Sequence, residues 1–158
     1  MNEIFNQMMS LYRREGADGE RNALYEVMQQ IVLCGLYRGG FFNEAAFYGG
    51  TCLRIFYGLK RYSEDMDFSL LTKNPDFSLE KYFPAIIEEA RLLGRDIVIT
   101  KKDKKNFSRV ESAFLKDNTD VYNLTFATDK TLKIKIEVDI DPPLGFKTEQ
   151  KLLMLPFS

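Results

Sequence analysis

The sequence predicts a single α+β domain, and three observations support that prediction. The chain has 158 residues, and a domain usually holds roughly 100–200, so residues 1–158 are expected to form one domain. Hydrophobic residues make up 45% of the chain, including 13 Phe and 8 Tyr, which supplies a core and excludes a disordered chain. Helical spacing of apolar residues recurs up to Gly94, after which the chain becomes largely β.

Two long helices and a shorter lead-in are expected. Residues 1–19 are expected to form a lead-in helix or arm. From Glu20, apolar residues follow helical spacing as far as Gly39 and Gly40, which end the helix. Ser78 suits the N-cap of the second long helix, whose apolar stripe runs over 82–93 and ends at Gly94. Both stripes are expected to pack into the core.

Strands are predicted where apolar residues alternate with polar ones or form short runs between turn residues. The expected strands cover residues 45–48, 63–71, 97–99, 113–115, 121–126 and 131–141. In strand 63–71, Met66 and Phe68 lie on one face, and Asp65 and Asp67 lie on the other. Two carboxylates are therefore expected to point the same way.

Composition excludes several kinds of chemistry. The chain has no His, which excludes triads that use His and zinc or haem bound by His. Its formal net charge is −1, so no global positive field attracts nucleic acid or lipid. Cys34 and Cys52 are too few for a disulfide scaffold and are expected to be buried, unreactive thiols. No signal sequence or long apolar run is present, so a cytoplasmic protein without membrane contact is expected.

One pair of motifs joins a glycine turn to two carboxylates. Gly49, Gly50 and Thr51 follow strand 45–48 and open a short helix, and Asp65 and Asp67 come next on strand 63–71. Glycines let a backbone approach a phosphate, and the amides at a helix N-terminus donate to it. Two carboxylates on one strand face suit Mg²⁺, which prefers oxygen ligands and bridges to phosphates. Each motif alone is more often a turn or a solvated strand face, but together they predict a nucleoside triphosphate site.

A third carboxylate is expected, because two divalent ions about 3.5–4 Å apart need more than two carboxylates. Strand 131–141 alternates apolar and charged residues and carries Glu137 and Asp139 on its polar face. The structural alternative is a charge ladder in which Lys133 and Lys135 pair across strands. With the first two motifs present, the ligand interpretation is preferred, and both carboxylates remain candidates.

Two segments resemble the signature of a known family. Phe47-Tyr48-Gly49-Gly50-Thr51-Cys52-Leu53-Arg54 and Arg61-Tyr62-Ser63-Glu64-Asp65-Met66-Asp67-Phe68 are similar to the AbiEii/AbiGii-type nucleotidyltransferase toxins, which are relatives of MenT in the DNA polymerase β-like superfamily. Segments 22–39, 135–139 and 155–158 also fit the amino-terminal lobe of that family. The resemblance therefore covers nearly the whole chain.

The resemblance implies a polymerase β-like fold, in which helices flank a mixed, mostly antiparallel sheet. It implies transfer of a nucleoside monophosphate from an NTP to a tRNA 3′ end or a protein hydroxyl, with Mg²⁺ or Mn²⁺ as cofactor. It also implies a toxin of a type IV, abortive-infection toxin–antitoxin system whose antitoxin is encoded alongside it.

Carried over by position, the resemblance assigns roles to single residues. The nucleotide site takes the glycine motif and flanking positions: Gly49, Gly50, Thr51, Arg54, Arg61 and Ser63. The metal site takes three carboxylates: Asp65, Asp67 and Glu137. Asp139 is the other catalytic candidate, because it suits a base near the incoming hydroxyl. The arginines either pair with phosphate or brace the carboxylates.

The family continues into a helical lobe beyond its Pro-Phe-Ser segment, whereas this sequence stops at Ser158. The expectation is therefore an amino-terminal domain alone, without the carboxy-terminal helical lobe. One alternative function is a non-catalytic module that binds a nucleotide or a partner protein. Another is a nucleotidyltransferase that acts on a small molecule.

One dense basic cluster is present, formed by Lys101, Lys102, Lys104, Lys105 and Arg109. Such a cluster can follow an RNA backbone. Because Phe107 alone interleaves an aromatic ring, a solvated loop is the preferred interpretation.

Overall fold

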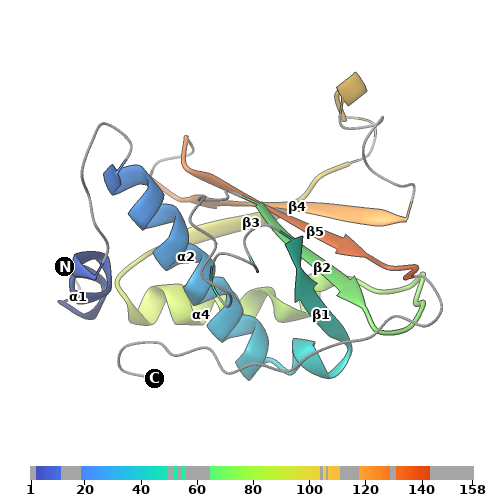
Figure 1. Cartoon of the computed structure of the whole chain (residues 1–158), viewed down its shortest axis with the longest axis horizontal. Coiled ribbons are helices and arrows are strands. Elements are labelled where there is room, and N and C mark those ends of the chain that lie inside the picture. The colour runs from blue at the N-terminus through green and yellow to red at the C-terminus, as the bar shows by residue number, and fades with distance from the viewer. Residues whose placement is uncertain are drawn as a thin grey trace.

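Five strands form one mixed sheet in the part of the chain that the structure describes. The computed structural model describes residues 3–11, 19–49, 52, 55, 65–103, 105, 107–110, 118–128 and 131–142. The strands are β1 (Ala45–Tyr48), β2 (Asp65–Leu70), β3 (Ile97–Lys101), β4 (Thr119–Phe126) and β5 (Lys133–Asp139). They lie in the order β1-β2-β5-β4-β3, in which only β2 and β5 pair in parallel (Figure 1). The predicted mixed, mostly antiparallel sheet flanked by helices is confirmed.

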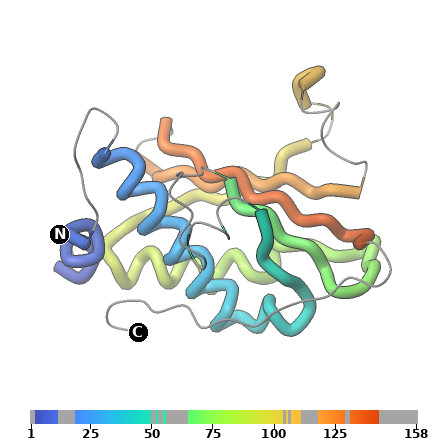
Figure 2. Tube along the Cα trace, viewed as in Figure 1, coloured from blue at the N-terminus to red at the C-terminus, as the bar shows by residue number. Residues whose placement is uncertain are grey.

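Helices cover one face of this sheet. The long helices are α2 (Gly19–Arg38) and α4 (Phe83–Leu92), and α1 (Glu3–Ser10) packs beside α2 (Figure 2). α2 and α4 approach closely at Gly35, where an added Cβ would lie 2.7 Å from the Cα of Ile86. Any larger residue at Gly35 would push the two helices apart. No helix among the described residues combines the length and apolar character needed to cross a membrane.

Apolar and polar residues alternate along the neighbouring strands β2 and β5, and the apolar ones form the core under these helices. Met66 and Phe68 of β2 are fully buried, as are Ile136 and Val138 of β5. Strand partners share a face, because Met66 pairs with Ile136 and Phe68 pairs with Val138. The intervening residues of both strands therefore point to the other side of the sheet.

Aromatic rings fill the core beneath β1 and β2. The ring centroid of Phe68 lies 5.0 Å from that of Phe47 and 5.2 Å from that of Phe41. Phe41 belongs to the 3₁₀ helix Phe41–Asn43, and its ring centroid lies 5.2 Å from that of Tyr82. Phe47 thus anchors β1 to the core.

Most predicted elements are confirmed, with ends that shift by one or two residues. The helix predicted from Glu20 is α2, and strands 63–71, 121–126 and 131–141 are β2, β4 and β5. Part of the lead-in segment forms α1. The predicted strand 113–115 lies outside the described residues.

Two boundary predictions differ from the structure. Ser78 caps the 3₁₀ helix Leu79–Tyr82, where its hydroxyl accepts a hydrogen bond from the Glu80 amide at 3.2 Å, and α4 begins only after this turn. Lys101 belongs to β3 and not to a loop, because it pairs with β4 and its ammonium lies 3.7 Å from the buried Asp120 carboxylate.

The two cysteines are half-buried instead of fully buried. The Cys34 thiol donates to a Glu89 carboxylate oxygen at 3.7 Å, and burial together with the charge of Glu89 raises the pKa of that thiol. The Cys52 thiol donates to the Phe47 carbonyl at 3.4 Å. A raised pKa keeps Cys34 protonated, which agrees with an unreactive thiol.

Candidate active site

The sheet face opposite the helices carries the predicted carboxylates. Three residue pairs of the parallel strands β2 and β5 lie on it: Asp65 with Lys135, Asp67 with Glu137, and Ser69 with Asp139. They share a face because the alternate residues of both strands point into the core. We call this surface the carboxylate face.

Asp67 and Glu137 are in direct contact on the carboxylate face. Burial, a hydrogen bond between the two carboxyl groups, and the charges of Glu137 and Asp65 raise the pKa of Asp67 from 3.8 to about 7. The Lys135 ammonium, 3.6 Å from Oε1 of Glu137, acts in the opposite direction on that pKa. Burial and the neighbouring Glu137 carboxyl group thus make ionisation of Asp67 less favourable than in an isolated side chain.

Gly49 brings the chain after β1 against the same carboxyl group. Its φ of 84° lies in the left-handed region, which favours glycine. An added Cβ would lie 2.5 Å from Oδ2 of Asp67, which is closer than two such atoms can approach. A glycine backbone therefore lies directly against the carboxyl group of Asp67.

Asp139 lies two register positions away from the contacting pair, on the same face of the sheet. It is opposite Ser69, it is 9% exposed, and its Oδ1 accepts a hydrogen bond from the Asp141 amide at 2.9 Å. Of the two candidates for a third carboxylate, the structure places Glu137 opposite Asp67.

Tyr48 also lies on the carboxylate face, although the sequence analysis assigns it no role. It pairs with Asp67 across β1 and β2. Burial and the charges of Asp67, Asp139 and Glu137 raise the pKa of Tyr48 to about 12. The missed signal was strand alternation, because Phe47 in the core requires Tyr48 to point the other way.

Five residues of the predicted nucleotide site lie outside the described residues: Gly50, Thr51, Arg54, Arg61 and Ser63. Of the motif residues, the structure therefore brings together Gly49, Asp67 and Glu137. Asp65 adds its charge to this group, since it contributes to the raised pKa of Asp67.

One residue of the basic cluster, Lys101, points away from the carboxylate face. Lys101 pairs with the core residue Tyr122, so it points to the helix-covered face. The Lys102 ammonium lies 5.4 Å from the centroid of the Phe107 ring. Lys105 and Arg109 are exposed, and Lys104 lies outside the described residues.

Within the described ranges, no group of three or more Asp, Glu or Cys side chains is arranged to hold a metal ion. The donor chemistry nevertheless suits a hard cation. Asp65, Asp67 and Glu137 lie on one face of the neighbouring strands β2 and β5 and offer carboxylate oxygens, which are the ligands that such a cation prefers.

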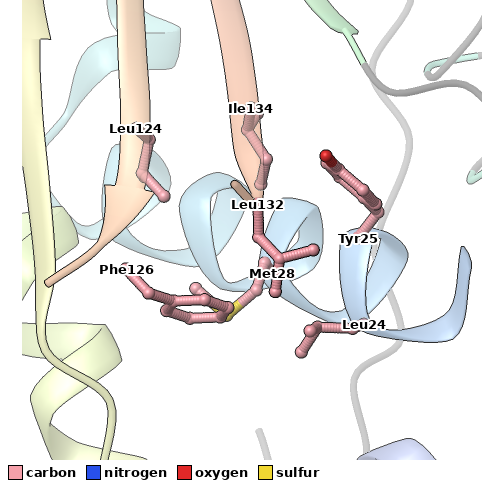
Figure 3. A pocket seen from close by; sticks show the side chains of 7 residues that line it. All are labelled: Leu24, Tyr25, Met28, Leu124, Phe126, Leu132 and Ile134. Atoms are coloured by element: carbon pink, nitrogen blue, oxygen red, sulfur yellow. The ribbon is translucent and has the colours of Figure 1, made fainter. Parts of the chain in front are cut away.

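An apolar cavity lies elsewhere, between α2 and the strands β4 and β5 (Figure 3). Its volume is about 10 Å³, and its lining residues are Leu24, Tyr25, Met28, Leu124, Phe126, Leu132 and Ile134. A wider cleft of about 440 Å³ shares Leu24, Phe126 and Leu132 with it and opens beside Arg95. The cavity has room for about one water molecule at most. Neither the cavity nor the cleft is lined by a residue of the carboxylate face.

A glycine backbone beside paired strand carboxylates suits the binding of a phosphate together with a divalent cation. The family model for the nucleotidyl transferase AbiEii toxin of type IV toxin–antitoxin systems matches residues 31–154. The chain therefore belongs to the AbiEii family of nucleotidyltransferase toxins.

Three solved structures are similar to this chain to different degrees. MenT4, a nucleotidyltransferase toxin from Mycobacterium tuberculosis H37Rv, matches 97% of this chain and 48% of its own, with 19% identity and a TM-score of 0.56. A protein from H. pylori described as a putative nucleotidyltransferase matches 80% of this chain and 48% of its own, with 20% identity and a TM-score of 0.49. JHP933 from Helicobacter pylori matches 76% of this chain and 44% of its own, with 19% identity and a TM-score of 0.48.

The likeness to MenT4 concerns the fold, because the identity is low. The chain spans about half the length of the solved structures that it matches. No curated protein matches the chain.

Proposed function

We propose that residues 1–158 form a nucleotidyltransferase domain that moves a nucleoside monophosphate from an NTP to an acceptor hydroxyl. The observation that carries this proposal is the contact of the Gly49 backbone with the Asp67 carboxyl group, beside Glu137. A glycine turn lets a phosphate approach the backbone, and carboxylates next to it attract the cations that accompany phosphates. Membership of the AbiEii family supports the same activity.

Three carboxylates would hold Mg²⁺ or Mn²⁺ in this proposal: Asp65, Asp67 and Glu137. A divalent ion supplies positive charge that offsets the charge of the triphosphate and of the leaving pyrophosphate. The register of β2 and β5 supports this set. Glu137 lies opposite Asp67, and Asp65 lies two residues before Asp67 on the same face of β2.

The nucleotide would lie along the glycine turn. Gly49 would offer its backbone to the phosphates, together with Gly50 and Thr51. The other proposed nucleotide-site residues are taken from the motif alone: Arg54, Arg61 and Ser63. Arginine suits this place because its planar, charged group pairs with phosphate oxygens in a bidentate manner.

In the transfer step, the acceptor oxygen forms a bond to the α-phosphorus. The bond from the α-phosphorus to the bridging oxygen breaks, and pyrophosphate leaves. The hydroxyl proton passes to a carboxylate, for which we propose Asp139, because it lies on the carboxylate face two residues after Glu137. Catalysis then consists mainly of positioning and electrostatic stabilisation.

The proposed acceptor is a tRNA 3′ end or a protein hydroxyl. In this proposal the protein is the toxin of a type IV toxin–antitoxin system, and its antitoxin is encoded alongside it and need not contact it. We place this activity in the cytoplasm, where NTPs and tRNA are found.

The test is transfer of label from each α-labelled NTP, with Mg²⁺, to total tRNA and to the protein itself. We expect label on one acceptor, and a loss of about 100-fold or more in Asp67→Asn. Asp76→Asn, which changes an exposed carboxylate in the loop after β2, serves as the control. Full Mg²⁺-dependent transfer by Asp67→Asn would contradict the proposal.

A second candidate is a module that binds a nucleotide without turnover. It is favoured by the lack of a three-ligand metal arrangement among the described residues. The same assay separates the two functions. Binding of NTP without any labelled product, by a protein that is fully folded, would support the module over the enzyme.

A further inference from the structure

Tyr48 is a large aromatic residue on the carboxylate face that takes no part in the chemistry above. It is the last residue of β1, it lies opposite Asp67, and it is 44% exposed. β1 is an edge strand of the described sheet, so the Tyr48 side chain stands at the border of the carboxylate face. An aromatic ring in such a place is available to a ligand.

The backbone on both sides of Tyr48 is held in place. Phe47 points into the core, where its ring stacks on that of Phe68 with 5.0 Å between the centroids. Gly49 has a φ of 84° and lies against the Asp67 carboxyl group. The Tyr48 ring therefore projects from a fixed Cα, and only two side-chain torsions remain to be fixed when a ligand binds.

Tyr48 brings no charge to the face. Three carboxylates, Asp67, Asp139 and Glu137, act on its phenol through their charge. A phenol has an ordinary pKa of about 10, so Tyr48 is neutral at pH 7 and offers a ring face and one O–H donor. A neutral ring beside three carboxylates is a poor metal ligand but a suitable surface for an uncharged, planar group.

We propose that Tyr48 is a positioning residue that holds the nucleoside part of the NTP against its ring while the Gly49 turn receives the phosphates. This inference rests on the proposed function. It is supported by sequence adjacency, because a ligand whose phosphates meet Gly49 has its nucleoside within reach of the preceding side chain. Every base has a π face, so Tyr48 contributes to the binding of all four NTPs.

The test compares the affinity of the full chain for NTPs and for inorganic tripolyphosphate, each with Mg²⁺, by calorimetry. We expect Tyr48→Ala to weaken NTP binding about tenfold or more. Tripolyphosphate has no nucleoside, so its affinity changes by less than about twofold. Tyr48→Phe keeps the ring and regains most of the affinity that Tyr48→Ala loses.

A second measurement uses the lack of Trp in the chain. Tyr48→Trp introduces a single indole on the carboxylate face, and we expect its fluorescence to be quenched by NTP but not by tripolyphosphate. Tyr37→Trp is the matched control, because Tyr37 lies on α2 and is 74% exposed on the other side of the sheet.

Each outcome separates this inference from the proposed function. If Tyr48→Ala binds NTP as tightly as the natural chain, the inference is overturned and the proposed function stands. If Tyr48→Ala loses NTP and tripolyphosphate alike, Tyr48 is structural and the inference is again overturned. If the natural chain binds neither ligand, the proposed function fails and this inference fails with it.

Discussion

The two faces of β2 and β5 differ in the contacts that their side chains make. One face has apolar groups packed together, and the other has carboxyl groups held close to one another. On the helix-covered face, Met66, Phe68 and Val138 are fully buried among other apolar groups. On the carboxylate face, Asp67 is held against Glu137, and its pKa is raised to about 7. A step of one residue along the same strand separates these environments. One face therefore stabilises the fold, whereas the other holds carboxyl groups close together, which raises the pKa of Asp67.

The largest effect is expected on the helix-covered face. Phe68→Ala should lower the free energy of unfolding by about 3–5 kcal/mol, because it leaves a cavity among packed rings. Val98→Ala is the control on the other face, where Val98 is 43% exposed and its truncation should cost less than about 1 kcal/mol. Urea denaturation measures both costs. Equal costs would show that the two faces contribute alike to stability.

A smaller effect is expected where the glycine turn meets the carboxylate face. Gly49→Ala should cost about 2 kcal/mol, because the new Cβ requires a strained φ and forces Asp67 away from Glu137. Gly40→Ala is the matched control, since Gly40 has a φ of 86° but its added Cβ would lie 3.4 Å from the nearest atom. Gly40→Ala should lower the free energy of unfolding by about 1 kcal/mol. Thermal denaturation tests the ordering, and NTP affinity should fall in Gly49→Ala alone.

The smallest effect is a pH dependence of stability that comes from Asp67. Its pKa is about 7 in the folded chain against an ordinary value of 3.8, so the folded state holds a proton between these values that the unfolded state has lost. Stability from this group is therefore greatest below pH 3.8 and declines as the pH rises to 7. Asp67→Asn removes this decline.

The full shift corresponds to roughly 4 kcal/mol, but Asp67 is only partly buried and solvent screens its charge. Relative to the natural chain, we therefore expect Asp67→Asn to gain on the order of 1 kcal/mol in the free energy of unfolding between pH 4 and pH 8. Denaturation at several pH values measures this gain. Asp76→Asn, at an exposed position, should show no such trend. The expectation is contradicted if the stability of Asp67→Asn relative to the natural chain does not increase as the pH rises. Asp67 would then ionise beside Glu137 without a loss of stability.

Strand alternation made the two faces predictable. The charged residues of 131–141 alternate with apolar ones, and β5 (Lys133–Asp139) follows that pattern with a difference of two residues at each end. Likewise, Asp65 and Asp67 lie on the face opposite Met66. A period of two residues determines the side of a strand to which each side chain points.

The contact between Asp67 and Glu137 could not be predicted by the same reasoning. Alternation leaves open which strands are neighbours and in what register, because these depend on the crossover through β3 and β4. For that reason both Glu137 and Asp139 remained candidates for the third carboxylate. The parallel register of β2 and β5 places Glu137 opposite Asp67 and Asp139 opposite Ser69. Lys101 shows the same limit, because its place in β3 comes from pairing with β4.

The central position of β5 determines when the site comes into existence during synthesis. β5 is the last strand that the structure describes, yet it lies between β2 and β4 and pairs with both. A nascent chain that has reached β4 carries Asp67 without its partner carboxyl group. Inserting β5 is a late, non-local event that closes two strand pairings together. In the proposed function, the pair of Asp67 and Glu137 is thus assembled only after Glu137 has left the ribosome.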